Sequence, residues 1–228
     1  MVIGTISCST DHQKGSSASL PPTKYKIDGS FEDWKTYKTL RTDIGIDWPK
    51  VVVTPKYDGV QFHQFYEDND SNYLYLFFKF KPSIQERYNN TPVGGDLDLD
   101  LGCLYIDTDA NTNTGCTEFD AKAGMGTIPG SEIQISFPTG IYADTATNGY
   151  YISYEIKRWN SATKSFDQAM RAADSRDSAS LIASGEDGVE VALLLSDLQV
   201  AEGNQISLAF WGGLTPKENV KRTTIELR

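Results

Sequence analysis

Residues 72–80, NYLYLFFKF, decide the fold class of this chain. The run is rich in aromatic side chains, which favour β-strands over helices. The turn sequence DND at residues 68–70 precedes the run and Pro82 follows it, so it is bounded as a strand is. Residues 62–65, just before that turn, have the same aromatic character and predict a second strand.

Residues 97–101, LDLDL, alternate apolar and acidic side chains with a period of two. This period places the three leucines on one face of a strand and the two carboxylates on the other. The pattern predicts a half-buried antiparallel strand.

Five further runs, separated by turn clusters, read as strands: 132–137, 150–159, 189–195, 205–210 and 222–227. The sequence NSATKS at residues 160–165 predicts a hairpin turn. No convincing long helix is apparent, although residues 166–173 could form a turn or two of helix. The chain is therefore predicted to be all-β, an antiparallel β-sandwich of two sheets and nine or ten strands, with a jelly-roll or immunoglobulin-like topology. Residues 24–228 form one domain in this prediction.

Composition excludes several functions. Of the 228 residues, 21 are Lys or Arg and 31 are Asp or Glu, giving a net charge of −10, which disfavours nucleic acid and anionic lipid surfaces as partners. No apolar stretch approaches the length of about 18 residues that a membrane span needs. Only His12 and His63 are present, which excludes zinc sites built from several histidines.

Residues 1–23 predict a signal remnant followed by a disordered tether. A short apolar run ends at Ile6-Ser7-Cys8, and Ser, Thr, Gly and Pro residues follow, as in the tail of a bacterial lipoprotein signal. This interpretation predicts export to the cell surface or periplasm, with a lipid anchor at Cys8. The alternative is a plain disordered N-terminus.

The loop at residues 107–118, DTDANTNTGCTE, carries oxygen side chains at alternate positions. Hard cations such as calcium take six to eight oxygen ligands, and this spacing can turn several oxygens toward one ion. The predicted calcium ligands are Asp107, Asp109, Asn111, Asn113 and Glu118. Thr112 stands where a helix-loop-helix calcium motif has Gly, so the likeness to that motif is one of ligand spacing alone. The alternative is a solvated hairpin loop, for which Asp and Asn are favoured residues.

Cys103 and Cys116 lie on either side of this acidic segment. In an exported protein, a disulfide between them would hold the two ends of the loop together. We therefore expect a Cys103–Cys116 bond. Two unpaired buried thiols are the alternative, favoured if the protein is cytosolic.

Five segments together carry a family resemblance. The chain resembles the family 9 carbohydrate-binding modules and the related DOMON-type β-sandwiches over nearly all of residues 24–227. The segments that carry it are YKIDGSFEDW (25–34), SNYLYLFFKF (71–80), LYIDTDANTNTG (104–115), GSEIQI (130–135) and VEVALLLSDLQVAEGNQISLAF (189–210). The resemblance implies an exported, often calcium-bearing sandwich and a structural role for Asp28, Gly29 and Trp34. It also implies that sugar-binding members clamp a sugar end between aromatic side chains, whereas one DOMON branch binds haem.

Sugar recognition requires exposed aromatic faces, because a pyranose ring presents C–H groups to an aromatic ring. The candidates are Trp48, Trp159 and Trp211, of which the last two end predicted strands. The alternative is that each Trp closes an end of the hydrophobic core.

We expect a non-catalytic, exported carbohydrate-binding protein with a calcium-stabilised loop. One alternative is an envelope lipoprotein that binds another protein. A haem protein would have to draw its axial ligands from His63, Met125 and Met170. A carbohydrate-active enzyme would need a pair of carboxylates, and no pair stands out. The oligomeric state is left open.

Overall fold

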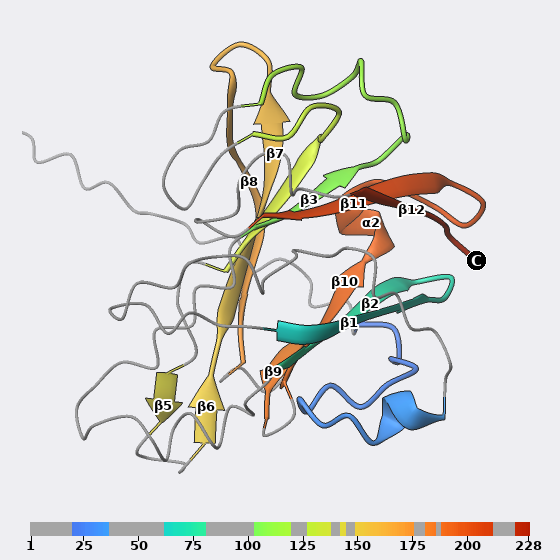
Figure 1. The fold of residues 1–228 in the computed structure, drawn as a ribbon, viewed down its shortest axis with the longest axis vertical. Coiled ribbons are helices and arrows are strands. Elements are labelled where there is room, and N and C mark those ends of the chain that lie inside the picture. The colour runs from blue at the N-terminus through green and yellow to red at the C-terminus, as the bar shows by residue number, and fades with distance from the viewer. Residues whose placement is uncertain are drawn as a thin grey trace, which may run out of the picture.

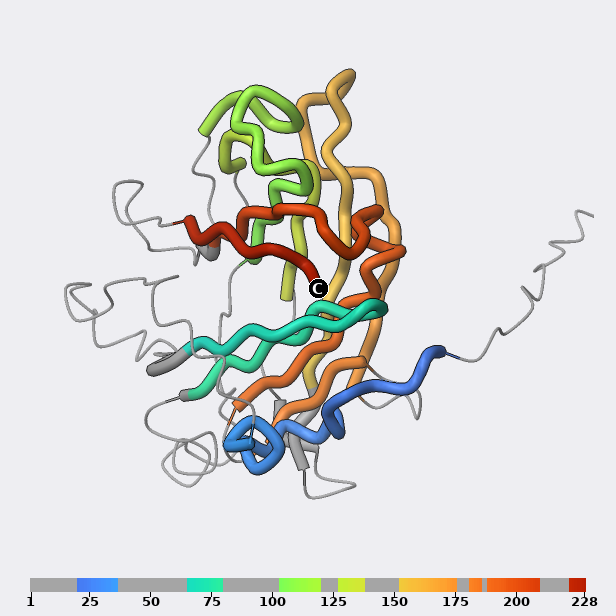
Figure 2. The backbone as a smooth tube through the Cα atoms, turned by 90° about the vertical axis from the view of Figure 1, so that its right-hand side faces the viewer, coloured from blue at the N-terminus to red at the C-terminus, as the bar shows by residue number. Residues whose placement is uncertain are grey.

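Two antiparallel sheets form the fold (Figures 1 and 2). The computed structural model describes residues 20–36, 62–80, 103–119, 127–137, 142–144, 149–175, 181–185, 188–211 and 222–228. The four-stranded sheet has the order β1 (Phe62–Asn69), β2 (Tyr73–Phe80), β10 (Gly188–Leu194), β9 (Ile182–Ser184). The six-stranded sheet has the order β12 (Arg222–Glu226), β11 (Gln205–Trp211), β3 (Cys103–Asp107), β4 (Ile133–Ser136), β7 (Ser153–Asn160), β8 (Ser165–Asp174).

The remaining described elements are short. Strands β5 (Tyr142–Asp144) and β6 (Gly149–Tyr151) form a separate antiparallel pair. A 3₁₀ turn spans Asp33–Lys35, and the helix α2 covers Leu195–Leu198 after β10. The prediction of an all-β sandwich of two antiparallel sheets is therefore confirmed.

Residues 161–164 turn between β7 and β8, which confirms the predicted hairpin. The suggestion of helical turns at residues 166–173 is wrong. This segment belongs to β8 and pairs with β7, for example Arg171 with Ile156. Pairing with β7 satisfies backbone groups on one edge of this segment, and this outweighs the local preference. The predicted strand at residues 97–101 lies outside the described residues.

The main core lies between the two sheets and is built from alternate residues of facing strands. One side comes from β2 and β10, and the other comes chiefly from β3, β4, β7 and β11. The buried side chains include Leu74, Leu76, Phe78, Val191, Leu193, Leu104, Ile106, Ile133, Ile135, Ile156, Ile206 and Leu208. Such two-sided packing of alternating residues is what makes a sandwich stable.

Strand β2 is buried on both of its faces. Its even-numbered side chains from Leu74 to Phe78 enter the main core, whereas Tyr73, Tyr75 and Phe77 enter a second cluster on the opposite face. The N-terminal segment, residues 24–34, supplies the other half of that cluster, mainly through aromatic rings. Its blue trace lies beside the four-stranded sheet in both views (Figures 1 and 2).

Two carboxylates attach this N-terminal segment to the sheet. Glu190, fully buried on β10, accepts hydrogen bonds from Trp34 Nε1 at 2.8 Å, from Asp28 N at 3.0 Å and from Gly29 N at 3.2 Å. On β1, the carboxylate of Asp68 accepts a 2.6 Å bond from the Tyr25 hydroxyl. Trp34 also stacks on Tyr25 with ring centroids 4.2 Å apart.

Gly29 makes this attachment possible. Its φ is +74°, and an added Cβ would lie 2.3 Å from the backbone nitrogen of Gly185. The structural roles expected for Asp28, Gly29 and Trp34 thus correspond to the contacts that these residues make with Glu190 and β9.

The outer face of β3 is covered by its own following loop. Cys103 and Tyr105 pack there with Ile128 and Ala209, and Phe119 lies against them. Gln134 donates a 3.0 Å hydrogen bond to the Tyr105 hydroxyl within this cluster. The segment after β3 therefore folds back over the sheet before β4 begins.

The predicted Cys103–Cys116 disulfide is absent, although both thiols are buried. Cys103 begins β3, whereas Cys116 lies near its far end, because Cys116 N bonds to Ser131 O just before β4. In this register Ser131 lies opposite position 108, and a strand rises about 3.3 Å per residue, so the two cysteines are separated by roughly 16 Å along β3. A disulfide needs Cα atoms closer than about 7 Å. The cysteine pair therefore gives no support to export.

Within the described residues, no helix is long and apolar enough to cross a membrane. The predicted signal remnant, including Cys8, lies outside the described residues.

Glu190 should give the fold a characteristic pH dependence. Burial raises its pKa from the ordinary value of 4.5 to about 7, against the three N–H donors, which favour the ionised form. Between pH 4.5 and about 7 the native state thus binds more protons than the unfolded chain, and the free energy of unfolding should fall as pH rises through this window. The Glu190→Gln variant should lose this slope, as measured by urea unfolding from pH 5 to 8.

In the Glu190→Gln variant the side-chain NH2 group would face an N–H donor, which destabilises the protein at every pH. The informative quantity is therefore the slope of the unfolding free energy against pH and not its absolute value. The matched control is Glu226→Gln on the exposed side of β12, which should keep the wild-type slope. Equal slopes in all three proteins would contradict the assignment.

Candidate functional site

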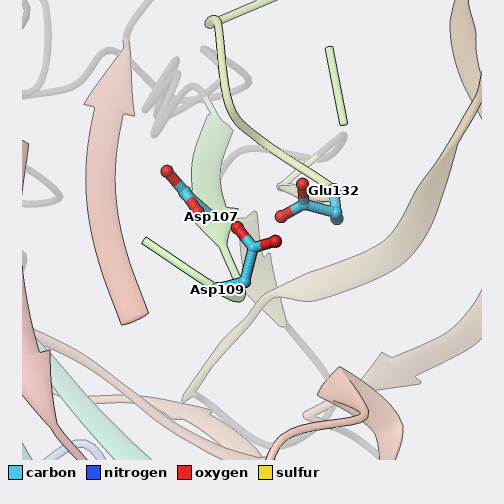
Figure 3. Close-up of side chains that lie close together, drawn as sticks. All are labelled: Asp107, Asp109 and Glu132. Atoms are coloured by element: carbon cyan, nitrogen blue, oxygen red, sulfur yellow. The ribbon is translucent and has the colours of Figure 1, made fainter. Parts of the chain in front are cut away.

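Three carboxylates meet where β3 ends and β4 begins. Asp107 is the last residue of β3 and Glu132 directly precedes β4. Ile106 pairs with Ile133, so this register sets Asp107 and Glu132 at the same end of adjacent strands. Asp109 joins them from the loop, and ligand atoms of all three lie within 4.8 Å of one another. Figure 3 shows the carboxylates of Asp109 and Glu132 turned toward each other, with Asp107 beside them.

Hydrogen bonds hold most of these oxygens in place. Asp107 accepts from Asn111 N at 3.0 Å and from Arg222 Nη1 at 3.2 Å. Glu132 Oε2 accepts from Thr108 N at 2.8 Å. By contrast, Glu132 Oε1 is buried and has no hydrogen-bond partner among the described residues. A buried carboxylate oxygen without a donor is costly, and such an oxygen can serve as a ligand for a cation.

The electrostatics of the cluster favour a cation. Burial raises the pKa of Asp107 and of Glu132, and the negative charges of the neighbouring carboxylates add to the rise. With Arg222 beside Asp107, three ionised carboxylates and one guanidinium leave two net negative charges. Calcium–oxygen distances are roughly 2.3–2.6 Å, so ligands on opposite sides of one ion lie about 5 Å apart. The three carboxylates could hold one divalent cation without large movement.

Two glycines let the backbone pass close to these carboxylates. An added Cβ at Gly115, where φ is +58°, would lie 2.5 Å from Glu132 Oε1. At Gly130, where φ is +83°, it would lie 2.7 Å from Thr112 Cα and 2.8 Å from Asp107 Oδ2. Both positions require the left-handed conformation and the small volume that glycine provides.

Two of the three predicted carboxylate ligands, Asp107 and Asp109, belong to the cluster, and the backbone N–H of Asn111 donates to both at 3.0 Å. Asn111 Oδ1 accepts the backbone N–H and the side-chain amide of Asn113 at 3.1 and 3.2 Å. Glu118 lies elsewhere, on a neighbouring pocket. The third carboxylate is Glu132, which spacing within the loop could not reveal. The signal for Glu132 was its position at the start of a strand, which pairing with β3 brings beside Asp107.

An open pocket of about 210 Å³ lies next to this cluster. It is lined by Trp159, by three residues of the loop 107–118 and by three further residues: Gly115, Thr117, Glu118, Thr127, Ser161 and Lys164. Trp159 is half-buried near the end of β7 and packs edge-on against Phe166, with centroids 5.2 Å apart. The pocket therefore combines one aromatic ring with groups that bind hydroxyls.

The pocket and the carboxylate cluster share backbone contacts. Trp159 N donates a 2.8 Å hydrogen bond to Glu132 O. Gly115, which lines the pocket, also lies against Glu132. A movement of Glu132 in the carboxylate cluster should therefore shift the backbone of Trp159.

The structure describes only some of the remaining candidates for sugar binding and haem ligation. Trp48 and Met125 lie outside the described residues. Trp211 ends β11 and His63 lies in β1, and the side chains of both lie outside the description. Met170 packs against the main core.

Comparison of the chain with protein-family models, with curated proteins and with solved structures found no match.

Gly130 provides a test of the loop closure. Replacing it with Ala should destabilise the protein by more than the cost of about 1–2 kcal/mol for a left-handed non-glycine residue, because the new methyl group meets the backbone of Thr112. The matched control is Gly203→Ala, where φ is +84° and no atom lies within 4 Å of the added Cβ. Urea unfolding of the two variants measures the difference. Equal losses would contradict the close packing at Gly130.

Proposed function

We propose that this protein is a non-catalytic carbohydrate-binding module that takes a sugar in the pocket beside Trp159 and is stabilised by calcium at the carboxylate cluster. The observation that carries the proposal is the adjacency of two features. An aromatic ring lines a polar pocket, and the three carboxylates Asp107, Asp109 and Glu132 lie directly beside it.

The lining of the pocket suits a sugar. An indole ring offers an apolar face to the C–H groups of a pyranose, and hydroxyls, amines and carboxylates take the sugar hydroxyls. Trp159 supplies the first kind of contact, and Thr117, Ser161 and Glu118 can supply the second. A volume of about 210 Å³ would accommodate about one sugar ring, which fits recognition of a chain end or a single residue.

Calcium has a structural role in this proposal. The ion would be held by Asp107, Asp109 and the otherwise unpartnered Glu132 Oε1, and it would offset the repulsion among the three charges. Because Glu132 O accepts the Trp159 backbone N–H, fixing Glu132 also fixes the aromatic residue. Sugar binding should therefore weaken when calcium is removed.

Export and a lipid anchor at Cys8 complete the proposal, since a glycan-binding module acts outside the cytoplasm. Both rest on the sequence of residues 1–23 alone.

Calcium binding can be tested with substitutions of two glutamates. Glu132 belongs to the ligand set seen in the structure, and Glu118 belongs to the set predicted from the loop spacing. Calcium at about 100 times its Kd should stabilise the fold by about 2.7 kcal/mol, seen as a rise in Tm by calorimetry. Glu132→Gln should abolish the rise while leaving the chelator-treated protein as stable as wild type or more so, because one of three adjacent charges is removed. Glu118→Gln should retain the rise.

The reverse result would be a calcium-dependent rise in Tm that is lost in Glu118→Gln and kept in Glu132→Gln. It would favour the ligand set predicted from the loop spacing, which includes Glu118. No calcium-dependent rise in the wild type would contradict the metal site itself.

Sugar binding can be tested on a broad glycan array, run once with calcium and once with a chelator. Wild type should bind one glycan class selectively and more weakly in chelator, and Trp159→Ala should lose that binding. The control is Phe166→Leu, which keeps the ring of Trp159 but removes its aromatic neighbour, and it should retain most binding. A blank array from a folded, calcium-stabilised protein would contradict the proposal and favour a protein ligand instead.

A further inference from the structure

We infer that Lys164 makes the pocket beside Trp159 selective for sugars that carry a carboxylate, the uronic acid class. This inference rests on the proposed sugar-binding function and specifies its ligand. It is drawn from the chemistry and backbone geometry of the hairpin tip, residues 160–167, which forms one wall of the pocket.

Lys164 is exposed on the pocket, and within the described part of the chain its ammonium group makes no ion pair or hydrogen bond. Three other described cations form ion pairs: Arg222 with Asp107, Arg171 with Asp197 and Lys157 with Glu155. Glu118 lines the same pocket, yet no ion pair joins it to Lys164. Both side chains are exposed, so a ligand in the pocket can contact both charges.

The backbone at Lys164 is unusual for a lysine. Its φ is +52°, in the left-handed region where glycine and asparagine are favoured at hairpin tips. A β-carbon is disfavoured there, as it also is at Ala110 and Gln199, so glycine at position 164 would relieve the turn.

The tip is held in one shape by a single carboxylate. Asp167 accepts hydrogen bonds from Asn160 Nδ2 at 3.0 Å, Thr163 Oγ1 at 2.6 Å and Ser165 Oγ at 3.0 Å. These bonds lower the pKa of Asp167, so the network persists at neutral pH. Lys164 is therefore presented from a preorganised turn, which reduces the ordering cost of binding.

The charge arrangement favours an acidic sugar in one orientation. A neutral sugar needs no cation, whereas a uronate offers its carboxylate to the Lys164 ammonium in a charge-assisted hydrogen bond. Glu118 accepts hydroxyl groups and repels a carboxylate, so it would turn the acidic group toward Lys164. The net charge of −10 opposes anions at long range, but salt at physiological strength screens that repulsion beyond about 8 Å.

The test compares matched oligosaccharides, galacturonic acid against galactose and glucuronic acid against glucose, by calorimetric titration in the presence of calcium. Wild type should bind one acidic member at least about tenfold more tightly than its neutral partner. Lys164→Gln should lose this preference, and Lys164→Arg should keep most of it. Lys157→Gln, which removes a paired lysine from β7, is the matched control and should bind as wild type does.

Lys164→Gly separates function from folding. Glycine relieves the positive φ, so this variant should melt at the same temperature as wild type or higher, yet lose the preference for acidic sugars. A preference that survives in Lys164→Gly would overturn the inference.

The failure of this inference is distinguishable from failure of the proposed function. Equal or tighter binding of neutral sugars to wild type would overturn the role of Lys164 and leave the sugar-binding proposal in place. Absence of binding to every acidic and neutral sugar, with the calcium-stabilised fold intact, would overturn both.

Discussion

The burial of strand β2 on both faces is the constraint on which the rest of the structure depends. One face packs into the core between the sheets, and the opposite face, with Tyr73, Tyr75 and Phe77, needs a separate cover. The N-terminal segment provides that cover and is attached through three N–H groups to the buried carboxylate of Glu190. Because an unpartnered buried carboxylate would be strongly unfavourable, the segment and the sheet stabilise each other.

The candidate site follows from the register of three strands in the other sheet. Pairing of β3 with β4 sets Glu132 beside Asp107, and pairing of β4 with β7 brings Trp159 to Glu132. Side chains from distant parts of the chain therefore meet at one sheet end, where strands position Asp107 and Trp159 and loops supply most of the pocket lining. Strands hold such positions more precisely than loops do.

The proposed metal and sugar sites are best understood as one unit. The three carboxylates carry repulsion that a divalent cation would relieve, and the same Glu132 holds the backbone of Trp159. Lys164 adds a charge of the opposite sign to the lining of the same pocket. Of the three candidate haem ligands, only Met170 has a described side chain, and it packs against the core.

The sequence by itself determined the fold class, because aromatic runs such as residues 72–80 and turns such as residues 160–165 depend on local periodicity and local backbone preference. It also singled out Asp107, Asp109 and Trp159. Only the tertiary structure decided that Glu132 joins the two aspartates, and that Cys103 and Cys116 stay apart. Sequence spacing reports which side chains are neighbours along the chain. Which strands pair, and in what register, is set by long-range hydrogen bonds and core packing that no single segment encodes.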